Sequence, residues 1–152
     1  MPDRLRTDLR AILLGGLVAG TIDLGAAALI NGLSPVTIMQ AVASGLLGKA
    51  AFHGGPPVAA LGMGLQWAMS LVIAAVYVIA ARWAPILRRR WLAGGLAYGA
   101  GVFAVMNYVV MPLSAVGHSP HFTPLSFSEN MLAMLLFGVL VAFFSRSPTT
   151  AA

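Results

Sequence analysis

The chain has 152 residues, of which 59% are apolar by the AVILMFWYC count, and it adds 17 glycines to that share. Its charged residues are nine Lys or Arg and four Asp or Glu, too few to cover the surface of a water-soluble domain of this size. The composition therefore argues against a soluble enzyme or binding domain, and the lack of cysteine excludes disulfides and thiolate chemistry.

Four apolar segments are long enough to cross a bilayer as helices. A hydrocarbon core about 30 Å thick needs about 20 helical residues, a length that is met or closely approached by residues 11–32, 57–81, 92–112 and 128–145. No charged or Ser-rich linker separates them, so we expect a single membrane domain over 1–152. The first segment continues past the small residues that a signal peptidase would need, so we expect it to be retained as a span.

A fifth apolar stretch, residues 35–53, is interrupted by Gln40, Ser44, Lys49 and His53. Eight of the nine cations are arginines that precede the first span, lie between the second and third, or follow the fourth. With four spans all eight fall on one side, which the positive-inside rule makes cytoplasmic. A fifth span would divide them. We therefore interpret 35–53 as an amphipathic or re-entrant helix that lies on, or dips into, the outer face.

The sequence thus predicts an all-α integral membrane protein with four transmembrane helices and both termini in the cytoplasm. The net charge of +5 does not indicate nucleic-acid binding, because the arginines form short runs between apolar stretches. Segment 43–50 has the spacing of a phosphate-binding loop, but Ala50 stands where Ser or Thr would bind magnesium, so we expect no nucleotide. His118 and His121 supply at most half of a metal site, and we expect no metal or other cofactor.

Polar side chains inside the spans are the candidates for function, because ionisable groups are costly in lipid. Asp23 lies near the middle of the first span, on the same helical face as Gly16 and Gly20. Comparable faces on the second and third spans carry Gln66 and Asn107. We expect these faces to meet inside the bundle, with helix-packing glycines at Gly16, Gly20, Gly95 and Gly99.

Besides exposure of Asp23 to water through a distorted bundle, two interpretations of this residue follow. In the first, which we favour, Asp23, Gln66 and Asn107 form hydrogen bonds between helices and fix their packing. In the second, Asp23 is a proton or cation site, and a re-entrant 35–53 segment brings Lys49 inward to pair with it.

Glu129 stands at the start of the fourth span. Ser126 followed three residues later by Glu129 fits a capping box, in which each side chain satisfies a free backbone amide of the helix start. The alternative is a place near the mouth of the bundle, beside Asn107. No nucleophile, base and orienting group occur together, so we expect no catalytic residues and no enzyme activity.

Three segments carry a resemblance to a known family: GGLAYGAG opens the third span, MPLSA closes it, and HFTPLSFSEN leads into the fourth. Over 92–146 the chain resembles the uncharacterised bacterial inner-membrane proteins of the YagU type. The resemblance implies a multi-pass protein of the bacterial inner membrane and carries no activity. We expect a structural or accessory membrane protein, with the lipid bilayer and a homo-oligomer or larger membrane complex as partners. The alternative is a small transporter or a proton- or ion-coupled conduit centred on Asp23.

Overall fold

The computed structural model describes residues 2–146. Over that range the chain consists of helices joined by irregular connections and contains no strand. In chain order the elements are α1 (Pro2–Asn31), α2 (Pro35–Leu47), the 3₁₀ helix η1 (Gly48–His53), α3 (Gly55–Trp83), α4 (Ile86–Arg89), α5 (Trp91–Val105), the π-helical segment η2 (Met106–Val110), α6 (Met111–Leu113) and α7 (Pro124–Ser145).

Four helices are long and apolar enough to cross a membrane. They are α1, α3, the continuous helix formed by α5, η2 and α6 over Trp91–Leu113, and α7. The prediction of an all-helical chain with four apolar helices of membrane-spanning length is therefore confirmed.

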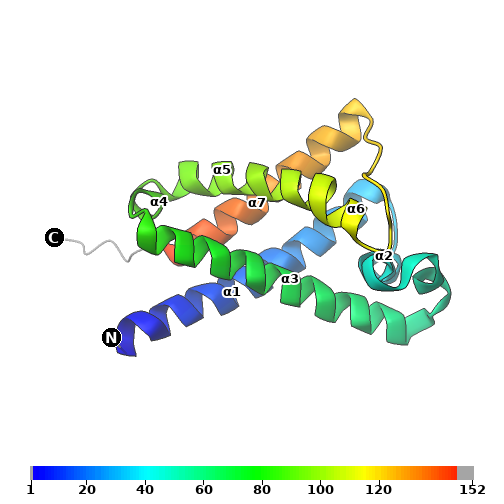
Figure 1. The fold of residues 1–152 in the computed structure, drawn as a ribbon, viewed down its shortest axis with the longest axis horizontal. Coiled ribbons are helices and arrows are strands. Elements are labelled where there is room, and N and C mark those ends of the chain that lie inside the picture. The colour runs from blue at the N-terminus through cyan, green and yellow to red at the C-terminus, as the bar shows by residue number, and fades with distance from the viewer. Residues whose placement is uncertain (1, 147–152) are drawn as a thin grey trace.

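The four long helices form a bundle with two distinct ends (Figure 1). Helix α7 packs against both α1 and α5, while α1 crosses α3, and α2 packs on α3. The start of α1, the turn that contains α4 and the end of α7 gather at one end. This end carries all eight arginines, and we call it the arginine end. At the opposite end, the far end, lie α2, η1 and the connection 114–123.

The buried core joins α1, α3 and α7. Small residues let the helices approach closely, and a few large side chains fill the space between them. Tyr77 and Phe137 are the largest of these and are almost fully buried. The complete cluster consists of Ala19, Ala74, Tyr77, Ala81, Phe137, Val141 and Ala142.

Two helix starts differ from the sequence prediction. Helix α1 begins at Pro2 and not near residue 11, because the helix continues beyond the apolar run into the charged segment. Helix α7 begins at Pro124 and not near 128, because Pro124 occupies the first turn, where a missing N–H costs nothing.

The predicted capping box of Ser126 and Glu129 is wrong. Thr123 is the residue before the helix, and its hydroxyl oxygen accepts from the Ser126 amide at 3.2 Å. The Ser126 hydroxyl oxygen in turn accepts from the Thr123 amide at 3.0 Å. Glu129 lies in the second turn, outside this arrangement.

Segment 35–53 is two short elements and not one helix. Ser34 caps α2 by accepting from the Thr37 amide at 3.2 Å, and Gly48, with a φ of 60°, ends it. Helix α2 has 13 residues and is about 20 Å long, too short to cross the hydrocarbon core. It is held at the far end partly by a backbone bond of 2.9 Å from Ala115 to Gly45.

A π-helical segment, η2, interrupts the third long helix just before Pro112. Proline has no N–H to donate to the carbonyl four residues earlier, so regular α-helical bonding cannot continue through it. The Met111 amide donates instead to Met106, five residues back. This local widening keeps the backbone bonded up to the end of the span.

Candidate functional site

The contact between α1 and α3 contains Asp23. The Gln66 side-chain amide donates to Asp23, with 3.0 Å between Nε2 and Oδ2, and the same nitrogen lies 3.3 Å from the Gly20 carbonyl oxygen. Asp23 and Gln66 are both partly buried. One side chain of α3 therefore binds α1 at two points, one on a side chain and one on the backbone.

Close helix approach surrounds this hydrogen bond. A Cβ placed on Gly16 would lie 3.0 Å from the Leu71 Cα, and one placed on Gly20 would collide with the Ser70 side chain. A second bond joins the same two helices, from the Trp67 indole to the Thr21 hydroxyl at 3.2 Å. The absence of a side chain at these two glycines allows the polar groups to meet.

Three other predicted polar candidates lie elsewhere. Lys49 is exposed on η1, and the described residues show no ion pair between it and Asp23, so the alternative in which the two pair is not found. The Asp23 carboxyl instead accepts from Gln66. Asn107 donates to the Phe103 carbonyl of its own helix at 2.9 Å and forms no bridge between helices. Glu129 is half-buried on α7. The structure thus brings together Asp23 and Gln66 only.

The second close contact joins α5 and α7. A Cβ on Gly95 would lie 2.8 Å from the Gly138 carbonyl oxygen, and one on Gly99 would lie 2.9 Å from the Leu135 Cα. Gly138 faces both of these glycines across the contact. Three of the predicted helix-packing glycines, Gly16, Gly95 and Gly99, therefore lie close to the backbone of the facing helix, whereas Gly20 lies against the Ser70 side chain.

An ion cluster at the arginine end was not anticipated from the sequence. Asp8 on α1 is buried, with 7% of its surface exposed. Its Oδ2 lies 2.6 Å from Arg82 Nη2, and its Oδ1 lies 2.9 Å from Arg88 Nη2. The carboxylate thereby ties the start of α1 to the end of α3 and to α4. Nearby, the Tyr77 hydroxyl donates to the Leu87 carbonyl at 3.2 Å.

The signal for this cluster was present in the sequence. Asp8 is an acid between Arg6 and Arg10, and an acid among cations is a candidate partner for them. Two of the arginines therefore have a second role beside marking membrane orientation, because Arg82 and Arg88 bind Asp8.

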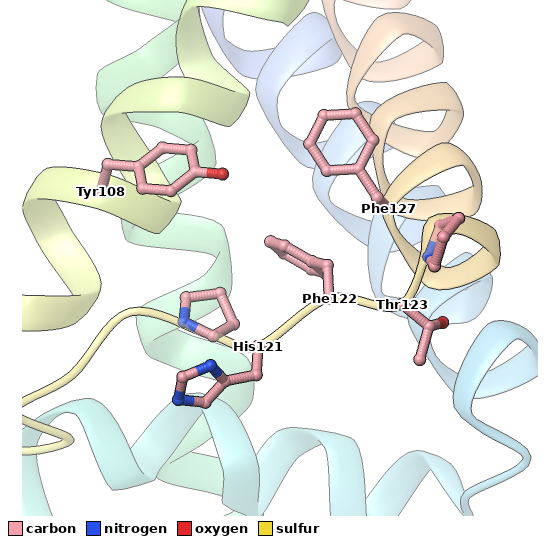
Figure 2. Close-up of a pocket in the computed structure, with 7 residues that line it drawn as sticks. Tyr108, His121, Phe122, Thr123 and Phe127 are labelled. Carbon is pink, nitrogen blue, oxygen red and sulfur yellow. The ribbon is translucent and has the colours of Figure 1, made fainter.

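A shallow pocket of about 530 Å³ lies at the far end, between η2, the connection 114–123 and the start of α7. It is lined by Tyr108, Pro120, His121, Phe122, Thr123, Pro124 and Phe127. Figure 2 shows Tyr108 and Phe127 extending from opposite walls and Phe122 projecting between them. Phe103, Phe122 and Phe127 form an aromatic cluster with centroid distances of 5.2–5.8 Å. Through this cluster the end of the connection 114–123 packs against α5 and α7.

Comparisons with known proteins found no matching family model, no matching curated protein and no matching solved structure. Within residues 2–146, no three His, Asp or Glu side chains gather as a metal site would require.

Proposed function

We propose that this chain is a multi-pass membrane protein of structural or accessory type, without enzymatic activity, whose polar intramembrane residues hold its helices together. The hydrogen bond between Gln66 and Asp23 carries this proposal. Both groups lie at the crossing of α1 and α3, beside two glycines that allow the helices to touch. Small residues together with polar side chains are the usual means of helix association in lipid.

The exposed apolar surface supports the membrane placement. Val72, Val76 and Ile79 lie on one face of α3, and each has at least half of its surface exposed. In water such a face would be costly, whereas lipid chains cover it without loss. Similar apolar positions occur on the other long helices, so we infer that the bundle is surrounded by lipid.

The arginine end supports an orientation. Its eight arginines lie opposite the far end, and among the described residues of the far end Lys49 is the single Lys or Arg. By the positive-inside rule we propose that the arginine end faces the cytoplasm of a bacterial inner membrane. Both ends of the chain are then cytoplasmic, and α2 with η1 lies on the outer face.

A second candidate function is a small transporter or a proton- or ion-coupled conduit. One observation favours it: the residue at the crossing is an acid that is only partly buried, whereas asparagine would accept the same hydrogen bond. Lys49 and Asn107, which this candidate would also use, lie away from Asp23.

The substitution Asp23→Asn separates the two. It keeps an oxygen that accepts from Gln66 and removes the charge. We expect proteoliposomes of the natural protein to show no more proton or cation flux than empty liposomes, and Asp23→Asn to insert and melt like the natural protein. A flux that the natural protein carries and Asp23→Asn lacks would overturn the accessory role in favour of the conduit. Asp23→Leu, which cannot accept the bond, serves as the matched destabilised control.

A further inference from the structure

We propose that the arginine end binds the headgroups of anionic phospholipids, through Arg89 and Arg90 beside the cluster of Asp8, Arg82 and Arg88. The inference rests on the membrane placement proposed above, and it adds a class of ligand that the helix-packing role does not require.

The charge balance at this end is strongly positive. Eight arginines gather there, against Asp3 and Asp8, which leaves six formal positive charges. The far end and the spans hold the remaining two acids, Asp23 and Glu129. Such an excess on one end attracts anions, and the anions available at a membrane surface are lipid phosphates.

Asp8 organises two of these cations. By binding Arg82 and Arg88 through its two oxygens, it holds their guanidinium groups side by side, and the cluster keeps one net positive charge. The Arg82 side chain remains half exposed while it is bound to Asp8. The Arg88 Nε is buried without a hydrogen-bond acceptor, so the protein does not satisfy this guanidinium completely.

Arg89 and Arg90 follow directly and are exposed. Arg89 ends α4 and Arg90 precedes α5, so both belong to the short connection between α3 and α5 that also holds Arg88 of the cluster. A guanidinium presents paired N–H donors that match the oxygens of a phosphate, and lipid phosphates are the abundant oxyanions at a membrane surface.

The position along the bundle fits the headgroup layer. Helix α1 has 30 residues and is about 45 Å long, about 15 Å more than the hydrocarbon core requires. Its charged first turns therefore extend to the level of the phosphates. Trp83, with 86% of its surface exposed, and Trp91 flank the arginine turn, as aromatic residues do at membrane interfaces.

The test uses the full chain in nanodiscs that contain equal phosphatidylglycerol and phosphatidylcholine. Native mass spectrometry measures which of the two lipids stays bound to the protein after the protein is released from the nanodisc. We expect enrichment of phosphatidylglycerol on the natural protein. In the double variant Arg89→Gln with Arg90→Gln, the enrichment should fall by about fivefold for each arginine that is replaced. The matched control is Lys49→Gln, which removes a cation from the far end and should leave the enrichment unchanged.

Equal retention of the two lipids, or an equal loss in the Lys49→Gln variant, would overturn the inference. Inorganic phosphate added in excess tests the other source of the same chemistry: if it displaces the lipid completely, the ligand is soluble phosphate and the lipid assignment is wrong. Incorporation into discs of phosphatidylcholine alone is measured first. A chain that fails this step contradicts the membrane placement, whereas one that passes and shows no lipid preference contradicts this inference alone.

Discussion

Gln66 and Asp23 face each other across the crossing of α1 and α3, with the amide nitrogen 3.0 Å from the carboxyl oxygen. The first prediction concerns their interaction energy. In a double-mutant cycle with Asp23→Ala and Gln66→Ala, we expect a coupling of about 0.6–2 kcal/mol in the free energy of unfolding, the range of interhelical hydrogen bonds in membranes.

The cycle is measured by unfolding in detergent, with Asp23→Ala and Asn107→Ala as the control pair. Asn107 bonds within its own helix, so that pair should show additive effects. Additivity of Asp23→Ala and Gln66→Ala would contradict the role assigned to the bond.

The second prediction compares two glycines on α5. Gly99→Ala should lower the free energy of unfolding by about 1–3 kcal/mol, because the added methyl group meets the α7 backbone at Met134 and Leu135. Gly101 has open space around its Cβ position, so Gly101→Ala should cause no loss. Thermal unfolding of the two variants checks this, and equal melting temperatures would show that the contact between α5 and α7 at Gly99 can accept a methyl group.

The third prediction concerns the cluster at the arginine end. Asp8→Ala should lower the free energy of unfolding by roughly 1–3 kcal/mol, since hydrogen bonds to charged groups are lost and two arginines remain close together. Proteolysis near α4 offers a direct readout, because loss of this tie frees the turn from α1. The variant Asp3→Ala, which removes an acid from the same end, is the control and should behave like the natural protein.

The fourth prediction distinguishes the two capping arrangements of α7. Thr123→Ala should destabilise the helix start by about 1 kcal/mol, because the Ser126 amide loses its acceptor. Glu129→Ala should have little effect on the helix start. Hydrogen exchange at the first turn of α7 measures both, and a larger effect of Glu129→Ala would restore the arrangement that the sequence suggested.

The long helices could be predicted from the sequence because membrane-spanning length and apolar composition are local properties. Their ends could not, because a helix continues while its backbone bonds are satisfied, as α1 does through its charged turns. The start of α7 depended on the pair Thr123 and Pro124, whereas the apolar run pointed to residue 128.

Contacts between distant residues were harder. The helical faces of Asp23 and Gln66 were visible in the sequence, and the structure brings these two together. Asn107 lies on a comparable face, yet its side chain finds the carbonyl of the preceding turn, which is always within reach. Lys49 is the single Lys of the chain, which makes it the candidate partner of Asp23 in the alternative interpretation, but it is exposed on η1 at the far end. Charge pairing alone carries no information on distance.

The proposed topology places the arginine end in the cytoplasm and the far end on the outer side of the membrane. Because the chain has no cysteine, single-cysteine variants need no background substitutions. Pro85→Cys marks the arginine end and Ala50→Cys the far end, and both positions are exposed. We predict that a membrane-impermeant maleimide added to intact bacterial cells stripped of their outer membrane labels Ala50→Cys and leaves Pro85→Cys unlabelled until the cells are lysed. Labelling of Pro85→Cys in intact cells, or of both positions alike, would contradict the proposed topology.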